Sequence, residues 1–207
     1  MFLHIILKRL LFAGTTIFCS FLFIPVNGQV SVKQWDVYEL TLTAKDKYQN
    51  PYAEIPVTDD ALIRATFTGT KGAAKGLTFT VYGFWDGDQT WKVRFAPPTT
   101  GTWEYRSASK DRGLDNVRGT LQVREWTESE KERNPVRRGF IGVKKSGPQP
   151  GRFFQYADGT PFLWIADTWW NWTKRGIKFE TFQEVVDDRA SKGFNLGQLF
   201  VAANGWG

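Results

Sequence analysis

The chain has 207 residues, of which 27 are Lys or Arg and 21 are Asp or Glu, and it contains one His and one Cys. Both single residues, His4 and Cys19, lie within a segment that has the layout of a cleavable signal peptide. The mature chain can therefore form no disulfide, thiolate nucleophile, Ser-His triad or His-ligated metal site. Carboxylates remain for acid–base chemistry, and no metal ion is expected.

Residues 1–28 predict export of the protein. Lys8 and Arg9 precede an apolar run that ends at Val26, and a polar, strand-like sequence begins directly after Gly28, where cleavage is expected. A retained N-terminal membrane anchor is the alternative that the length of the apolar run leaves open. If the signal peptide is cleaved there, we expect a secreted or periplasmic protein that is not stably inserted in a membrane.

The charge of the mature chain indicates the kind of partner. Loss of Lys8 and Arg9 lowers the count of Lys plus Arg from 27 to 25, which leaves a net charge of +4 against 21 acidic residues. A basic exported protein favours acidic polysaccharide or an anionic surface. Nucleic acid is not expected as a partner, because the basic residues are scattered and the protein is exported. The oligomeric state stays open.

Residues 29–125 predict an all-β sandwich of the immunoglobulin-like type that lacks the usual disulfide. Short runs with strand character alternate with turn residues, and no helical period is present. Asp86-Gly87 predicts a hairpin turn that places Trp85 and Trp91 on neighbouring strands. The expected strands are 36–44, 61–69, 77–83, 90–96, 101–107 and 117–124.

All ten Trp residues lie in the mature part of the chain. Trp35, Trp91 and Trp103 are expected in the core of the sandwich. The cluster of Trp169, Trp170 and Trp172 differs, because it follows directly on the end of an apolar run.

Dense charge and an Asn-Pro step in residues 126–138 indicate a solvated connector, and we place the domain boundary there. Two short strands are expected at 138–144 and 152–156. Asp158-Gly159 then predicts a turn into Pro161.

Residues 139–207 predict the start of an α/β domain. Residues 162–166 are apolar on both faces, as a parallel strand covered on both sides requires. Apolar residues recur with helical period from Phe179 to Ala190, and Gly193 is expected to end the helix. A strand at 194–201 would complete a β-α-β unit with a parallel pair and a right-handed crossover. Asp167 would then lie at the carboxyl end of the first parallel strand, where such folds carry their sites; the alternative is that Asp167 only caps a turn.

Three motifs in residues 158–194 carry a family resemblance: D-G-x-P-F, A-D-T-W-W and F-x-x-x-x-x-D-R-x-x-K-G-F. They resemble the beginning of the apiosidase-like catalytic family of (β/α)8 glycoside hydrolases. The upstream segments W-D-V-Y-E-L, N-P-Y, G-F-W-D-G, W-K-V-R-F-A-P and G-T-W-E-Y resemble the immunoglobulin-like module that precedes such domains in secreted bacterial carbohydrate-active proteins.

The resemblance implies a TIM-type barrel in which two carboxylates hydrolyse a glycosidic bond without a cofactor. Pro161 to Gly207 comprises 47 residues, whereas a complete barrel takes about 250. The chain is thus expected to contain about two of eight strands and no catalytic residue of its own.

The same resemblance implies substrate contacts around the scissile bond for the first-strand motif, and sugar stacking for the tryptophans after it. Asp187 and Asp188 are not candidates, because they fall on a solvated helix face beside Arg189. The candidate substrate-binding residues are Asp167, Thr168, Trp169, Trp170, Trp172 and Asn204.

The sequence therefore predicts the N-terminal part of a secreted glycoside hydrolase that acts on side chains of plant or algal-type polysaccharides, with the chain itself inactive. The alternative is a non-catalytic carbohydrate-binding or surface-adhesion module in which the sandwich does the work. In both cases the partner is an oligo- or polysaccharide.

Overall fold

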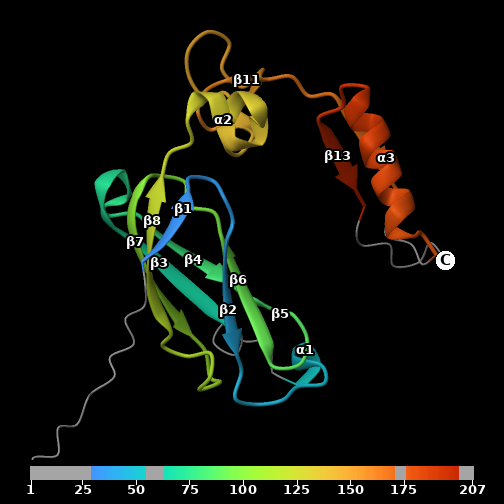
Figure 1. Cartoon of the computed structure of the whole chain (residues 1–207). Coiled ribbons are helices and arrows are strands. Elements are labelled where there is room, and N and C mark those ends of the chain that lie inside the picture. Colours follow the sequence, from blue (N-terminus) through green and yellow to red (C-terminus); the bar gives the residue numbers. More distant parts are fainter. Residues whose placement is uncertain (1–28, 55–62, 171–175, 201–207) are drawn as a thin grey trace, which may run out of the picture.

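The computed structural model describes residues 29–54, 63–170 and 176–200 (Figure 1). The predicted signal peptide, with His4 and Cys19, lies outside these ranges. Within them, every helix is too short or too polar to cross a membrane.

The described chain is mostly β-sheet with a few helices. The first part contains β1 (Val30–Lys33), β2 (Tyr38–Thr43), α1 (Pro51–Glu54), β3 (Arg64–Lys71), η1 (Gly72–Ala74), β4 (Thr78–Tyr82), β5 (Phe84–Trp85), β6 (Thr90–Phe95), β7 (Gly101–Ala108) and β8 (Arg118–Arg124). The second part contains α2 (Glu128–Arg133), η2 (Pro135–Arg138), β9 (Gly142–Val143), β10 (Phe154–Gln155), β11 (Pro161–Phe162), β12 (Ala166–Trp169), α3 (Phe179–Ser191) and β13 (Leu196–Leu199).

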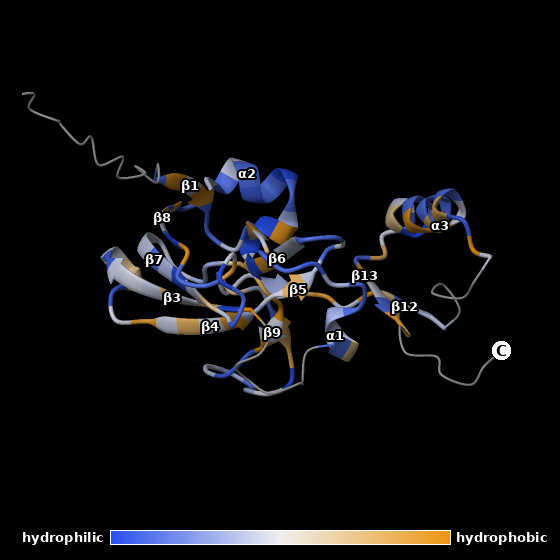
Figure 2. Ribbon diagram, turned by 90° about the horizontal axis from the view of Figure 1, so that it is seen from below, coloured by the Kyte–Doolittle hydropathy of each residue, from blue (hydrophilic) through white to orange (hydrophobic). Residues whose placement is uncertain are grey.

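Two sheets share the core of the first part. One has the strand order β1-β8-β7-β3-β4 and the other the order β2-β6-β5. Phe67 of β3 stacks on Phe95 of β6 with ring centroids 4.0 Å apart, and Trp103 of β7 lies 5.3 Å from Phe95. Because these rings join the two sheets, the sheets face each other across one apolar layer; Figure 2 shows the hydrophobic segments of these strands.

The Asp86-Gly87 hairpin prediction is confirmed. β5 pairs antiparallel with β6, and Trp85 lies opposite Trp91. The positive φ angles fall one residue later than predicted, on Gly87 and Asp88. Asp88 also accepts the Trp85 indole N–H through its backbone carbonyl at 2.8 Å.

The expectation for Trp35 is wrong, whereas Trp91 and Trp103 are core residues with 1% and 0% exposure. Trp35 lies in a turn after β1 with a φ of 65° and is only half-buried. Its indole ring lies against Gly139, where an added Cβ would come within 2.6 Å of the ring. Trp35 therefore packs at the junction with the following segment.

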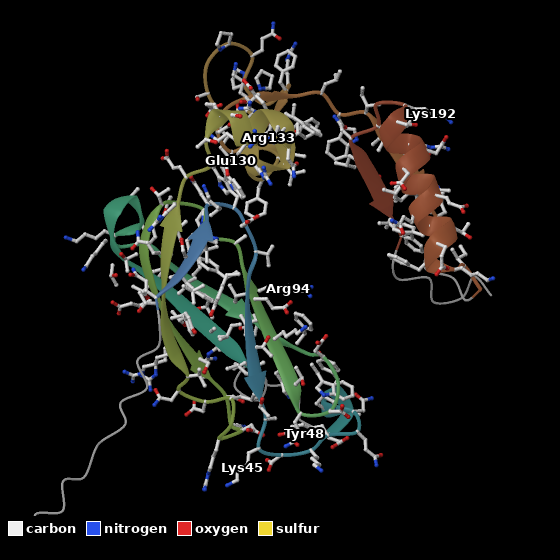
Figure 3. All side chains as sticks on the ribbon, in the orientation of Figure 1. Lys45, Tyr48, Arg94, Glu130, Arg133 and Lys192 are labelled. Carbon is white, nitrogen blue, oxygen red and sulfur yellow. The ribbon has the colours of Figure 1, made fainter. Side chains whose placement is uncertain are left out.

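Asp111 fastens two loops at the end of the two-sheet body that lies away from α2. Its carboxylate accepts the backbone N–H groups of Lys45, Asp46 and Gly113 at 2.8, 3.0 and 2.7 Å, and the Tyr48 hydroxyl at 3.3 Å. Asp111 is only 6% exposed, so these donors satisfy a buried charge. Figure 3 shows Lys45 and Tyr48 at this end.

The segment at residues 126–138, which is expected to be a solvated connector, is folded, and α2 and η2 contain no buried residue. Thr127 and Glu130 form a capping box at the start of α2, with the Glu130 carboxylate accepting the Thr127 backbone N–H at 2.8 Å. The Trp126 indole N–H donates to the Gln34 carbonyl at 2.9 Å. Lys33 of β1 lies 4.9 Å from the centroid of the Trp126 ring and 3.5 Å from the Glu130 carboxylate.

The other end of this segment is bound to the hairpin that follows. Arg138 lies 3.0 Å from the Asp158 carboxylate, which also accepts the Thr160 N–H at 3.0 Å. Lys131 of α2 adds a longer contact of 3.8 Å to Asp158. The charged residues of this segment therefore form specific ion pairs with β1 on one side and with the Asp158 turn on the other.

The three-stranded sheet β11-β10-β9 contains the two strands expected after the connector, shortened to two residues each. The Asp158-Gly159 turn is confirmed, with Gly159 at a φ of 89° and its N–H donating to the Tyr156 carbonyl at 2.9 Å.

The predicted strand at 162–166 is wrong in its position. Phe162 belongs to β11, and the parallel strand β12 begins only at Ala166. Between them, Asn195 binds the backbone: its side chain accepts the Ile165 N–H at 3.1 Å and donates to the Leu163 carbonyl at 2.6 Å. These hydrogen bonds to the Asn195 side chain replace the strand-to-strand backbone hydrogen bonds that a β-strand would form here. The Leu163 side chain is 72% exposed.

The predicted helix and the parallel pairing are confirmed. β12 and β13 pair in parallel with Ala166 opposite Leu196, and α3 lies between them in the chain (Figure 2). α3 ends in a Schellman motif, in which Gly193 N–H donates to Ala190 and Phe194 N–H donates to Arg189. Gly193 has a φ of 83°, as a C-terminal stop requires.

Candidate functional site

The β12–β13 pair presents two faces, because side chains alternate along a strand. Asp167 and Trp169 share one face, and each of them contacts α3. Thr168 lies between them on the opposite face and is exposed. In the parallel register, Asp167 is opposite Gly197 and Thr168 is opposite Gln198, so Gln198 shares the face of Thr168.

Asp167 forms an ion pair with the helix. Arg189 Nε of α3 donates to its carboxylate at 2.7 Å, and the Thr168 backbone N–H donates to it at 2.9 Å. The Arg189 hydrogen bond, aided by the Thr168 N–H and the Trp169 side chain, lowers the pKa of Asp167 against the opposing effect of desolvation. Asp167 is therefore a carboxylate anion at neutral pH. Its position as the second residue of β12 corrects the expectation that it lies at the strand's carboxyl end.

A small network of charges continues along α3 from Arg189. Arg189 Nη1 donates to Asp188 at 2.7 Å, and Lys192 lies 2.7 Å from the same carboxylate. Figure 3 shows Lys192 at the end of the helix. The guanidinium is thus shared between one carboxylate of the strand and one of the helix, which fixes its orientation.

Trp169 packs between the strands and the helix. Its ring meets Phe182 of α3 edge to face with centroids 5.8 Å apart. A Cβ added at Gly197 would lie 2.6 Å from the same ring, so the absence of a side chain at this position of β13 makes room for the indole. Trp169 therefore occupies the helix-facing layer.

An exposed aromatic pair follows the carboxyl ends of both parallel strands. Trp170 comes directly after β12 and Phe200 directly after β13, and their ring centroids lie 5.8 Å apart. The Phe200 N–H donates to the Trp169 carbonyl at 3.3 Å, which holds the two strand ends together. Trp170 is 64% exposed and Phe200 39%. Aromatic surface of this kind stacks on the apolar faces of sugar rings.

The structure thus divides the predicted site residues. Asp167 and Trp169 face α3, Thr168 is exposed on the other face, and Trp170 lies beyond the strand end. Trp172 and Asn204 lie outside the described residues. In the described part of the chain, no three His, Cys, Asp or Glu side chains gather closely enough to hold a metal ion.

Sequence reasoning missed three residues of this unit. Arg189 was visible in the D-R pair of the helix but was considered only as a neighbour of Asp188. Phe200 is an aromatic residue at the end of the second strand, in the position that Trp170 occupies after the first. Asn195 gives no local signal, because its partners Leu163 and Ile165 lie some thirty residues earlier.

Two family models match the chain. Residues 31–110 match a domain of unknown function, DUF5060, and residues 148–206 match the apiosidase-like catalytic domain. The resemblance at the carboxyl-terminal part is thereby confirmed. The second match contains all of β10–β13 and α3, and so includes Asp167, Trp170 and Phe200. None of the curated proteins matches the chain.

A solved structure is also similar: a "putative glycoside hydrolase" from Bacteroides vulgatus, with a TM-score of 0.61 and 26% sequence identity. The similarity covers 83% of this chain and 28% of that protein. The chain therefore spans little more than a quarter of the structure it resembles. It is similar to a glycosidase-related protein in both parts of its described fold.

Proposed function

We propose that the chain is the amino-terminal part of a secreted glycoside hydrolase, consisting of an immunoglobulin-like sandwich and the first β-α-β unit of a TIM-type barrel. The observation that carries this proposal is the match of residues 148–206 to the apiosidase-like catalytic domain, which coincides with the parallel β12–α3–β13 unit. The signal peptide at residues 1–28 accounts for export, and the substrate is a side chain of a plant or algal-type polysaccharide.

The role of this part in the complete enzyme is to bind sugar beside the scissile bond. Trp170 and Phe200 offer an aromatic platform at the strand ends, and Thr168 and Gln198 offer polar groups on the face that α3 does not occupy. Asp167 and Arg189 hold β12 against α3, so they position this platform. Hydrolysis needs two opposed carboxylates at a fixed separation, and we assign these to the remainder of the barrel.

The experiment compares the chain with a complete enzyme that carries the rest of the barrel. Release of reducing sugar from a panel of plant and algal polysaccharides is measured for both, and for the Trp170→Ala variant of the complete enzyme. We expect no turnover by the chain alone, turnover by the complete enzyme, and a raised KM for Trp170→Ala. Turnover by the purified chain would contradict the assignment of the carboxylates.

The alternative, a non-catalytic carbohydrate-binding module, is favoured by one observation: the two-sheet body makes up most of the described chain and has an open, polar sheet face. A complete gene product that binds a polysaccharide of the panel without hydrolysing any would support this alternative over the hydrolase.

A further inference from the structure

A hollow opens between β4 of the five-stranded sheet and β6 of the three-stranded sheet. Its volume is about 520 Å³. Phe79 of β4 lines it and is 40% exposed, although its ring lies 6.0 Å from Phe95 and 5.8 Å from Trp103 of the core. Phe140, from the segment after η2, also lines it and is 60% exposed. The hollow therefore exposes the apolar core at one side of the two-sheet body. The other lining residues are Val37, Thr80, Val81, Arg94, Ala96 and Pro98.

The outer edge of β4 carries backbone groups that β3 does not use. Backbone hydrogen bonds of 2.8 Å join β4 to β3 at the Leu77 carbonyl and the Gly83 N–H. Backbone groups alternate in direction along an antiparallel strand, so the N–H and C=O groups of Thr78, Thr80 and Tyr82 face away from β3. Among the described strands, β4 lies at the end of its sheet. No described strand therefore pairs with this edge.

β6 has a similar unpaired stretch beside the hollow. The Gln89 carbonyl accepts a backbone hydrogen bond from the segment of β2 at 2.8 Å, so in this register the backbone groups of Arg94 face away from β2. On that side β5 pairs with β6 only as far as Phe84 opposite Lys92. In the described part of the chain, unpaired backbone groups thus lie on both sides of the hollow.

The edge of β4 also lacks the usual protection against strand addition. Its sequence, TFTVY, contains no charged residue and no proline, which are the residues that normally discourage pairing at an exposed edge. The charge of Arg94 is already used, because its Nε donates to Glu39 at 2.8 Å and its guanidinium lies 4.8 Å from the Phe84 ring centroid. The hollow therefore suits an uncharged, extended polypeptide segment with apolar side chains.

The position of the hollow indicates where such a segment comes from. The hollow borders the contact between the two-sheet body and the part that follows, since Gly139 packs against the Trp35 ring and Phe140 is the next residue. The solved structure that the chain resembles is much longer, because the similarity covers only 28% of it. An occupant from the rest of the catalytic part would enlarge a contact that already exists.

We propose that an extended, uncharged segment from the remainder of the catalytic part adds as a strand to the outer edge of β4 and places apolar side chains in the hollow. The sandwich would then share a sheet with the catalytic part and hold it in a fixed orientation. This inference rests on the proposed function in one respect, namely that the remainder of the barrel is present in the complete enzyme.

Amide hydrogen exchange at single-residue resolution tests the proposal on the chain and on the complete enzyme. The Thr80 N–H should exchange at least about tenfold more slowly in the complete enzyme, because a hydrogen bond to the added strand must first break. The N–H groups of Phe79 and Val81 face β3 and serve as internal controls, with equally slow exchange in both proteins. Equally fast exchange of Thr80 in both would overturn the proposal.

Polysaccharide turnover measured on the same samples separates this inference from the proposed function. Turnover with an unprotected Thr80 would overturn the strand addition alone, whereas protection without turnover would support it and contradict the hydrolase. Protection of Thr80 that rises with the concentration of the chain by itself would assign the edge to a second copy, and would also overturn the proposal.

Proline variants test the same edge through stability. Thr80→Pro removes the outward N–H and leaves the hydrogen bonds to β3 in place, and proline is tolerated at such edge positions. Thr78→Pro is the matched control, because the Thr78 N–H also faces outward but Thr78 does not line the hollow. Both variants should shift the melting temperature of the chain alike. In the complete enzyme, Thr80→Pro should lower it by about 2–4 °C more than Thr78→Pro does. Equal shifts there would overturn the proposal.

Discussion

Asp111 and Asp167 are both aspartates with a lowered pKa, but different surroundings lower it. Burial raises the pKa of Asp111, yet three backbone N–H groups and the Tyr48 hydroxyl outweigh that effect. Burial and the neighbouring Asp111 charge raise the pKa of Tyr48 to about 12, so the phenol stays a donor. At Asp167 the main cause is the single guanidinium of Arg189. The first carboxylate joins two loops, and the second joins a strand to a helix.

Replacement of Asp111 with Ala should lower the stability of the two-sheet body by about 3 kcal/mol, because it leaves three backbone N–H donors and the Tyr48 hydroxyl without their acceptor. Thermal unfolding followed by circular dichroism should show a fall in melting temperature of about 10 °C or more. Asp115→Ala serves as the control, since Asp115 is an exposed carboxylate in the same loop. Equal effects of the two variants would contradict the role given to Asp111.

The same site predicts a pH dependence. The pKa of Asp111 is lower in the folded state than its ordinary value of 3.8, so the stabilisation is complete above that value and is lost as pH falls below it. We expect the wild-type melting temperature to fall between about pH 4 and pH 2. Asp111→Asn, which has no charge to lose, should show a shallower fall. Parallel pH profiles for the two proteins would argue against this linkage.

Because Asp167 faces Arg189, its replacement should act on the strand–helix contact. Asp167→Asn and Arg189→Gln should each speed amide hydrogen exchange in β12, and the double variant should exchange no faster than the singles, since either change already breaks the pair. In the complete enzyme, kcat/KM per folded molecule should fall only slightly, because Asp167 acts on the substrate only through the position of the Trp170–Phe200 platform. Direct substrate contact by the carboxylate would instead lower it about ten- to a hundredfold, which kinetics on Asp167→Asn would reveal.

At the scale of elements, local chemistry decides where α3 ends. Gly193 has a φ of 83°, and no heavy atom of the described residues lies within 4 Å of an added Cβ, so the backbone conformation is what opposes a side chain there. Of the five residues predicted for the apolar face, Phe182, Val185 and Val186 are half-buried, whereas Ala190 is exposed and Phe179 is 72% exposed.

Gly193→Ala should therefore destabilise the β12–α3–β13 unit by about 1 kcal/mol, the usual cost of a left-handed residue with a side chain. Gly142→Ala is a matched control, because Gly142 also has open space around an added Cβ but no positive φ. Hydrogen exchange of the α3 amides should respond to the first change and not to the second. Equal protection of α3 in both variants would count against a strained C-terminus.

The elements that could be predicted from the sequence are those whose signals are local. The hairpin at Asp86-Gly87 and the helix from Phe179 depend on a few consecutive residues, and both are present. β1 could not be predicted, because its partner β8 lies far along the chain. The start of β12 was misplaced for the same reason: Asn195 binds the backbone of residues 163–165 from the opposite end of the unit. For the site, the aromatic residues could be predicted, whereas the pairing of Asp167 with Arg189 needed the fold.

At the scale of the whole molecule, the segment at residues 126–138 works as a joint. Trp126 and Lys33 bind it to the two-sheet body, Trp35 packs on Gly139, and Arg138 binds it to the Asp158 turn. A stretch that composition alone assigns to a linker therefore ties both of its neighbours through specific contacts.

Residues 29–125 should fold alone, since the core is complete without the joint. Extension to residue 139 should raise the melting temperature by about 5 °C, equivalent to about 1 kcal/mol, because Trp126 and Gly139 then cover Gln34 and Trp35. The Trp126→Ala variant of the longer protein should lose most of this gain. Identical melting temperatures for the two lengths would restore the view of residues 126–138 as a passive linker.

The parallel pairing of β1 with β8 has a consequence for the order of events during synthesis. Val30 is opposite Leu121 and Lys33 is opposite Arg124, so the first strand of the sheet to leave the ribosome has the last one as its partner. Among the described strands, β1 lies at the edge of the sheet and pairs with β8 alone. β1 must wait, unpaired, until the whole sequence of the five-stranded sheet has emerged. A chain with this topology keeps one edge of its five-stranded sheet incomplete for as long as its last strand is being made.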